Sequence, residues 1–303
     1  MSEIKNGFHI VDKPTLASCQ KFLDKEHINI DNCIVTTEVV VHKNWEFIVK
    51  RLAQKRIDEW KTLLGASKCI ILFNTGLNFR DNLHLLNVAY KSNRDPNKKP
   101  KKLKEVRELI QSLYYCEYFH DVEADDGIAM YMVKGSKNPG SYIAITPDKD
   151  AKQTPGYLFN PMNNEIRECS GFGEIELIVK QSPSGSKTYK IDGKGRSFFY
   201  YQMICGDPID SYSFKKPPVT PYRFYNDFKD IKNDKEAWQY IVNTYYNHFG
   251  NITEYIIHNG TIVKGTYLDI IQTYCDVVHM RRWENDRIDV RKTLKKLGVE
   301  FNE

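Results

Sequence analysis

The sequence lacks the hallmarks of membrane proteins and of disulfide-stabilised proteins. No stretch of about 18 apolar residues occurs, so we expect no membrane-spanning helix. The seven cysteines are odd in number and none stands in a CxxC pair, which is typical of free thiols in a reducing compartment. The N-terminal residues contain no apolar core of a signal peptide, so we expect a cytoplasmic protein.

Internal repeats and low-complexity tracts are also absent, whereas charge is concentrated in one place. The 303 residues are 41% hydrophobic, which is enough for one large domain or two small ones. Residues 91–107 contain eight basic and two acidic residues, a net charge of +6 in a chain whose total is +5. Such a segment predicts contact with a polyanion. A solvated loop without a partner is the alternative.

Apolar periodicity predicts alternating strands and helices. Short apolar runs at 7–11, 69–73 and 142–145 are typical of buried strands, and residues 47–64 and 103–114 have helical spacing. This alternation predicts an α/β fold with a mostly parallel central sheet flanked by helices. We expect an α/β core over 1–170, a β-hairpin insertion over 171–197, and a helical C-terminal region over 198–303 with helices at 237–249 and 268–283.

Acidic residues follow several of these apolar elements. One strand end carries Asp12, and the three clusters comprise Glu123, Asp125, Asp126, Asp148, Asp150, Asp207 and Asp210. Because carboxyl ends of parallel strands meet at one edge of a sheet, we expect one carboxylate-lined cavity. Hard oxygen ligands suit Mg²⁺ or Mn²⁺, and two such ions are the arrangement for phosphodiester hydrolysis. The alternative for the cluster at 123–126 is a solvated first turn of a helix.

The basic segment should stand over this cavity, since it follows the strand at 69–73. It places Tyr90 beside Lys91 and Arg94, and the lysine run comes next. Aromatic and basic side chains in alternation suit single-stranded nucleic acid, which binds by stacking and phosphate contacts. Tyr90 is equally suited to a core position.

Five motifs in this order give the chain a resemblance to a known family. They are FHIVD at 8–12, FR with YKSNR at 79–80 and 90–94, VEADD at 122–126, PDKD at 147–150 and GDPID at 206–210. Together they resemble the 5′ nuclease family of flap endonucleases, polymerase 5′ nuclease domains and phage 5′–3′ exonucleases, with most similarity to the compact T-odd phage enzymes. The resemblance runs from about residue 8 to residue 210 and is weaker beyond.

The resemblance implies a PIN/flap-endonuclease-like fold with a helical arch over about 78–115. It implies a monomeric, divalent-metal-dependent 5′–3′ exonuclease of DNA replication that binds DNA 5′ ends in a duplex or flap. Flap endonuclease activity and primer removal from RNA–DNA hybrids are further implied activities. Two Mg²⁺ ions, with Mn²⁺ as a substitute, would be the cofactors, and a phage-encoded protein would act in the host cytoplasm.

The resemblance also implies a role for each matching residue. Asp12, Glu123, Asp125 and Asp126 would bind or orient one metal, and Asp148, Asp150, Asp207 and Asp210 would serve the other. Lys91, Arg94, Asp148 and Asp150 would be catalytic. DNA contacts would come from Arg80, Tyr90, Lys91, Arg94, Lys98, Lys99, Lys101, Lys102, Lys104, Lys215 and Lys216.

Two departures from the family pattern keep alternatives open. The family usually has an Asp just after the second strand, where this chain has Asn74. Pro217, Pro218 and Pro221 preclude the glycine-rich hairpin that grips duplex DNA in many members. The alternatives are a non-catalytic DNA-binding replication factor of the same fold and a PIN-type ribonuclease, although PIN domains are usually shorter and lack the YKxNR motif.

Overall fold

The computed structural model describes residues 16–40, 49–95, 97, 102–207, 209–212, 214 and 217–302. The strand expected at 7–11 and Asp12 lie outside these residues, as do Lys98, Lys99, Lys101, Lys215 and Lys216. None of the described helices combines the length and the apolar character that crossing a membrane requires.

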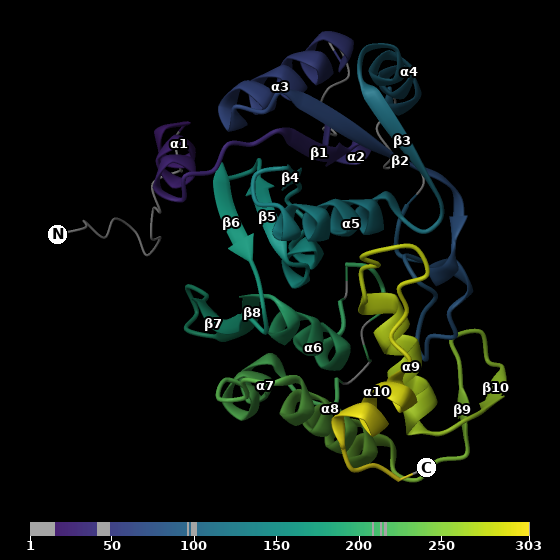
Figure 1. Cartoon of the computed structure of the whole chain (residues 1–303). Coiled ribbons are helices and arrows are strands. Elements are labelled where there is room, and N and C mark those ends of the chain that lie inside the picture. The colour runs from purple at the N-terminus through teal and green to yellow at the C-terminus, as the bar shows by residue number, and fades with distance from the viewer. Residues whose placement is uncertain are drawn as a thin grey trace.

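A six-stranded sheet forms the centre of the N-terminal half (Figure 1). Its strands are β1 (Asn32–Thr36), β2 (Lys68–Asn78), β3 (Tyr115–Asp121), β4 (Tyr142–Ile145), β5 (Gly156–Asn160) and β6 (Glu165–Cys169). The order is β3-β2-β1-β4-β5-β6, and all neighbours pair in parallel except β5 and β6. The prediction of a mostly parallel α/β sheet is confirmed.

Helices cover both faces of this sheet. One face carries α1 (Leu16–Lys25), α3 (Val49–Leu64) and α4 (Leu103–Leu113), while α5 (Ala124–Lys137) covers the other (Figure 1). The alternation along β1 shows why: Cys33 and Val35 pack in the cluster with α3 and α4, and Ile34 packs in the cluster with α5. The short α2 (Thr37–Val40) follows β1 directly.

Helix α5 approaches the sheet closely because Gly127 has no side chain. A Cβ at this position would lie 2.5 Å from Phe119 Cζ of β3 and 3.0 Å from Leu72 Cδ1 of β2. Both distances are shorter than ordinary carbon contacts, so any side chain here would force Phe119 and Leu72 to shift. The close approach places the acidic first turn of α5 at the carboxyl ends of β2 and β3.

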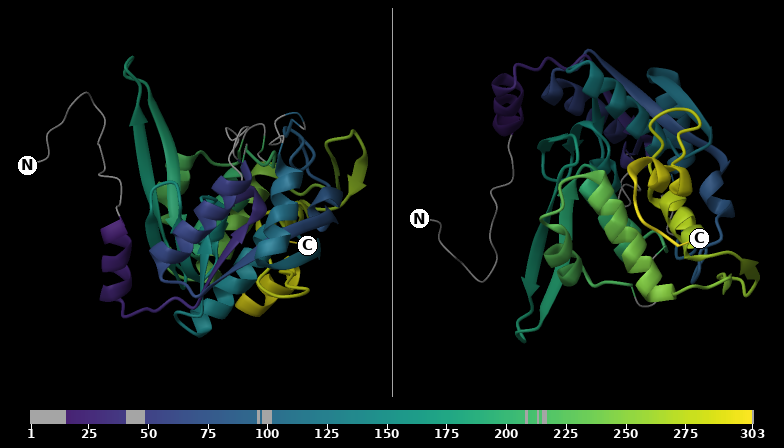
Figure 2. Two further views of the ribbon diagram at one scale, coloured as in Figure 1. Left: turned by 90° about the horizontal axis from the view of Figure 1, so that it is seen from above. Right: turned by 60° about the horizontal axis from the view of Figure 1, so that its bottom comes forward.

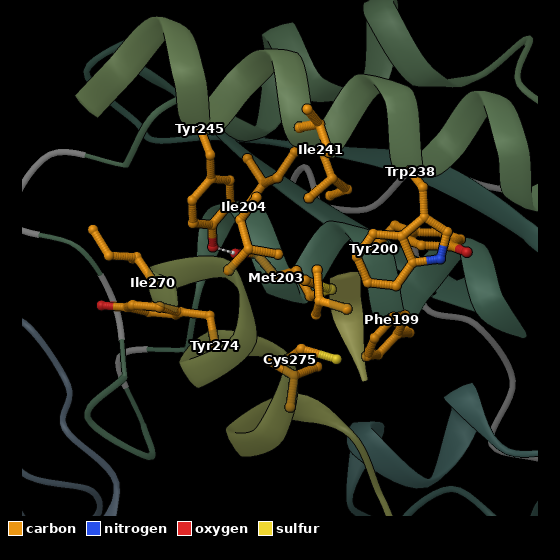
Figure 3. Close-up of a cluster of buried hydrophobic side chains, with 14 of the residues drawn as sticks. Phe199, Tyr200, Met203, Ile204, Trp238, Ile241, Tyr245, Ile270, Tyr274 and Cys275 are labelled. Atoms are coloured by element: carbon orange, nitrogen blue, oxygen red, sulfur yellow. Dashed lines mark hydrogen bonds between the residues drawn. The ribbon is translucent and has the colours of Figure 1, made fainter. Parts of the chain in front are cut away.

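The C-terminal half is mostly helical and packs below α5 in Figure 1. Its helices are α6 (Arg196–Cys205), α7 (Pro221–Phe228), α8 (Asp234–Phe249), α9 (Tyr267–Val278) and α10 (Val290–Leu297). Aromatic side chains from α6, α8 and α9 fill the core between them (Figure 3). The Tyr245 hydroxyl donates to the Met203 carbonyl at 2.6 Å, which satisfies its buried polar atom and fixes α8 against α6.

Two β-hairpins extend from this half. The expected hairpin is present as β7 (Glu174–Gln181) and β8 (Lys187–Lys194), which pair antiparallel and project from the body (Figure 2). A second, shorter hairpin of β9 (Glu254–Ile256) and β10 (Ile262–Lys264) was not expected from the sequence. The helix predicted for 268–283 is wrong at its end: α9 stops at Val278, since His279 turns away to bond Asp286.

Candidate active site

A cavity of about 450 Å³ opens at the carboxyl ends of the central strands. Thr36 at the end of β1, Asn74 in β2 and Asp148 after β4 line it, together with Asp125 from the first turn of α5. Lys91 and Arg94, from the segment between η1 (Phe79–Asn82) and α4, complete this wall. Three of the expected groups of residues therefore meet at one sheet edge, as parallel topology requires.

Asp148 and Asp150 are held in place by the turn that follows β4. Asp148 caps the short 3₁₀-helix η3 (Lys149–Gln153), and its Oδ1 accepts from the Asp150 backbone N–H at 2.9 Å. The Gln202 side-chain amide of α6 donates to Asp150 Oδ1. Both aspartates therefore receive hydrogen bonds from neutral donors.

The Asp148 and Asp150 carboxyl groups have raised pKa values. Desolvation is the largest cause for both, and the charges of neighbouring aspartates add to it. The effect is larger at Asp150, where desolvation and then the Asp148 charge raise the pKa well above its ordinary value. Carboxylates that repel one another in this way are stabilised by a shared cation.

The loop after α6 brings two further carboxylates to the same place. Asp207 Oδ1 accepts from the Ile209 N–H at 2.9 Å, and Lys149 Nζ lies 2.5 Å from Asp207 Oδ2. Arg94 Nη2 lies 2.9 Å from Asp210 Oδ1. Asp207 and Asp210 act on the pKa of Asp150 through their charges, which places all four carboxylates in one electrostatic cluster.

Asp210 also fixes the backbone of the basic segment. The Lys91 N–H donates to the Asp210 carbonyl at 2.9 Å. Lys91 has a φ of 54°, in the left-handed region that non-glycine residues adopt at a cost of about 1 kcal/mol. The hydrogen bond holds this conformation and directs the Lys91 side chain into the cavity.

On the other side of the cavity, Glu123 is surrounded by donors. Lys91 Nζ bonds Glu123 Oε1, and the Tyr90 hydroxyl donates to Glu123 Oε2 at 3.1 Å. The pKa of Tyr90 is raised well above its ordinary value by desolvation and by the Glu123 charge, so Tyr90 remains a proton donor. Tyr90 thus packs against the acidic turn.

Asp126 is engaged by a buried arginine. Arg80 is 3% exposed and donates to both Asp126 carboxylate oxygens, at 2.7 and 2.9 Å. Arg80 also donates to the Val277 and His279 carbonyls at 3.0 and 2.7 Å. The Arg80 side chain therefore faces the interior in this structure, and its contact with DNA stays a prediction. The role of Asp126 at a metal stays a prediction.

These features can be compared with solved structures. Bacteriophage T5 nucleases match 88% of this chain and 96–97% of their own length. They include a T5 protein co-crystallised with metal ions (15% identity, TM-score 0.53), a T5 flap endonuclease in a pseudo-enzyme-product complex with DNA and metal ions (14%, 0.55), and a zinc-bound T5 5′-exonuclease (17%, 0.55).

The chain has the fold of the T5 5′ nucleases. At 14–17% identity the likeness concerns the fold. The sequence itself matches no protein-family model and no curated protein.

Strand β1 holds a central position in the described sheet. This strand, Asn32–Thr36, lies between β2 and β4. Thr36 and Thr37 stand at its carboxyl end, and both are buried. The role of Asp12, which lies outside the described residues, stays a prediction.

Among the described residues, the carboxylates that could hold a divalent cation gather mainly on the Asp148 side of the cavity. Four carboxylates gather around Asp148 and Asp150, and oxygen ligands of this kind suit Mg²⁺. As they stand, no three acidic, histidine or cysteine side chains of the described residues converge tightly enough to hold an ion. Lys149 and Arg94 bond Asp207 and Asp210 instead, so a cation has to displace them.

Two of the lysines expected to form the arch lie in the described part of the chain. Lys102 and Lys104 have side chains 52% and 88% exposed, next to Glu105 and Glu108 respectively. Such exposed pairs are weak, so both lysines remain available to a polyanion.

Several site residues escaped the sequence analysis. Thr36 lines the cavity, and Lys149 and Gln202 contact the acidic cluster. None of the three was assigned a role, although Lys149 lies within the PDKD motif. Gln202 carried a usable signal, because it is the one amide in the run FFYYQMIC. A polar residue inside an apolar element predicts a buried hydrogen bond.

Proposed function

We propose that this protein is a divalent-metal-dependent nuclease that hydrolyses phosphodiester bonds from the 5′ ends of DNA, as an exonuclease and on flaps. The observation that carries this proposal is the convergence of Asp148, Asp150, Asp207 and Asp210 beside Lys91 and Arg94. The neighbouring structures of the same fold, named as flap endonuclease and 5′-exonuclease and solved with metal ions, support it.

In this proposal, acidic residues of the cavity bind the metal ion and basic residues bind the phosphate. Asp148 and Asp150 would hold the ion, which supplies activation of a water and stabilisation of charge on the phosphate. Lys91 and Arg94 would contact the phosphate that is cut, since charge-assisted hydrogen bonds strengthen as negative charge develops. Approaching phosphate would compete with Asp210 for Arg94, whose side chain is 60% exposed.

A non-catalytic DNA-binding protein of the same fold is the second candidate. Uncharged Thr36 and Asn74 favour it, because they line the cavity from the end of β1 and from within β2, where carboxylates would be expected in an active nuclease. A protein of this kind would bind 5′ ends through Lys91, Arg94 and the arch lysines without cutting them.

One experiment separates the two candidates. Duplex and flap DNA labelled at either end is incubated with the full chain and Mg²⁺, or with EDTA. Asp150→Asn should lower the rate at least about 100-fold, whereas Asp230→Asn, at an exposed position outside the cluster, should leave it unchanged. Short products from the 5′ label that vanish with EDTA support the nuclease. Binding without cleavage in Mg²⁺ and Mn²⁺ would establish the second candidate.

A further inference from the structure

Another cavity lies in the helical C-terminal half of the chain. Its volume is about 340 Å³, and its walls come from α6, α8, α10, the end of η3 and the segment between α9 and α10. Among the described residues, it has no lining residue in common with the acidic cavity. The volume lies within the range of about 300–1,000 Å³ that is usual for small-molecule sites.

Two buried polar side chains line this cavity without a hydrogen-bond partner in the described part of the chain. Thr154 is 1% exposed and Trp238 is 3% exposed. The Trp238 ring packs against Phe199 and Tyr200 (Figure 3), but no described group accepts from its Nε1–H or bonds the Thr154 hydroxyl. The fully enclosed atom without a partner is a different one, Asn163 Oδ1, so both groups keep access to the cavity. Because buried polar groups are normally paired, their partner is expected inside the cavity.

Three basic side chains line the same cavity and keep donors free. Arg196 uses Nε for Asp234, at 2.7 Å. Arg282 uses Nε and Nη2 for Asp286, at 2.9 and 3.4 Å. Both Nη atoms of Arg196, Nη1 of Arg282 and the exposed Lys296 ammonium make no hydrogen bond to any described residue. These groups can therefore bind a ligand without breaking a contact of the protein.

The charges of the described residues around this cavity favour an anion. Asp234 lines it, and Asp286 contacts two lining residues, Arg282 and His279. Each of the two acids is paired with one arginine, so the charge of Lys296 is left over. His279 adds no charge at pH 7, because burial lowers its pKa below 6.5. A cavity with surplus positive charge and free N–H donors attracts anionic ligands.

The rest of the wall is apolar and suits a flat ring. Phe199, Ile288 and Leu297 line this part. At about 30 Å³ per water molecule, the cavity has room for about eleven waters, which is more than a lone phosphate ion fills. Phosphate oxygens match the planar donor fork of arginine, and an apolar wall accommodates a base.

We propose that this cavity binds a nucleoside monophosphate. Its phosphate accepts from Arg196, Arg282 and Lys296, and its base lies against the apolar wall with Trp238 at its edge. The site is separate from the acidic cavity, and the proposal does not depend on whether the chain cleaves DNA.

Isothermal titration calorimetry of the full chain tests the proposal. EDTA is present throughout, so that no divalent ion can hold a phosphate in the acidic cavity. The probes are thymidine 5′-monophosphate and deoxyadenosine 5′-monophosphate, beside thymidine and inorganic phosphate. We expect one nucleotide per chain with a Kd below about 1 mM, and roughly tenfold weaker binding of thymidine and of phosphate. Absence of binding for both nucleotides at about 10 mM, or phosphate bound as tightly as a nucleotide, would overturn the proposal.

Single substitutions locate the bound nucleotide. Lys296→Gln and Trp238→Phe should each weaken binding about fivefold, the effect of one lost hydrogen bond. Lys292→Gln is the matched control, because Lys292 is exposed on the same helix and does not line the cavity. Arg94→Gln, in the acidic cavity, should leave the affinity unchanged.

Two results of this series would contradict the location. Loss of binding in Arg94→Gln would place the nucleotide in the acidic cavity. Unchanged affinity in Lys296→Gln would remove the phosphate contact. Circular dichroism checks the fold of each variant, and Lys296→Gln decides alone if Trp238→Phe does not fold, since Lys296 is exposed.

Discussion

The buried pair of Arg80 and Asp126 gives a prediction with a calculable size. In the variant Asp126→Asn, the Arg80 guanidinium stays buried, but its nearest remaining carboxylate is Glu123 at 3.8 Å. Removing one partner of a buried ion pair typically costs about 3–5 kcal/mol, because the other charge is left without compensation. At about 2.1 cal/mol/K per residue, this loss lowers the Tm of a 303-residue chain by roughly 5–8 °C.

The measurement is a double-mutant cycle in guanidinium chloride. Asp126→Asn, Arg80→Met and the double variant are unfolded in parallel, and the free energy of unfolding is extrapolated for each. The double variant should lose less than the sum of the two single losses, because it removes both charges together. Additive losses, or a loss below about 1 kcal/mol in Asp126→Asn, would refute the reasoning.

The same pair predicts the direction in which stability changes with pH. Burial alone would raise the pKa of Asp126, but the Arg80 charge and the hydrogen bonds to the carboxylate outweigh it, and the pKa lies below 3.8. The stability that ionised Asp126 contributes is therefore present above about pH 4, and it is lost as the pH falls through the lowered pKa. Natural protein should lose more stability than Asp126→Asn between pH 4.5 and about pH 2.5 on acid titration.

Two further predictions concern packing and histidine titration. Gly127→Ala should lower the free energy of unfolding by about 1–3 kcal/mol, since the new Cβ would lie 2.5 Å from Phe119; an unchanged denaturant midpoint would contradict the packing. Burial lowers the pKa of His279 below 6.5 despite its hydrogen bond to Asp286. The unfolded chain therefore binds this proton at a higher pH than the folded chain, and the stability should fall as the pH drops below about 6.5. His279→Gln should flatten this slope in a series of thermal melts from pH 7.5 to 5.5, and an equally steep slope would show that another group titrates.

Sequence patterns predicted the fold class because the longer helices and strands have clear apolar periodicity. The helices at 47–64 and 103–114 correspond to α3 and α4, and the strand at 69–73 lies within β2. The central strand β1 was missed because its run NCIVT is short and bordered by polar residues. Its four buried residues show that burial on both faces, and not alternation, defines this strand.

The parts of the site in which charged residues cluster along the sequence were predictable. The parts in which tertiary contacts determine the position of a side chain were not. Acids after apolar elements indicated the cavity, although Asp207 follows a helix, α6, and not a strand. Arg80 stands in a segment rich in polar residues, and nothing in its neighbours showed that Val277 and His279 carbonyls would enclose it. These contacts join residues almost 200 positions apart, which local patterns do not report.

The pairing of β1 with β4 also determines when the cavity can form during folding. Asn32 pairs with Tyr142, so this contact closes a loop of about 110 residues. Loop closure of that length costs about 4 kcal/mol in chain entropy before the strands gain any contacts. Parallel pairing at such separation is slow compared with helix formation. Asp210 lies further along the chain than β4 and is therefore synthesised later. A ribosome must therefore finish two thirds of the chain before the acidic cluster can assemble. A shorter nascent chain lacks Asp207 and Asp210 and cannot form the complete site.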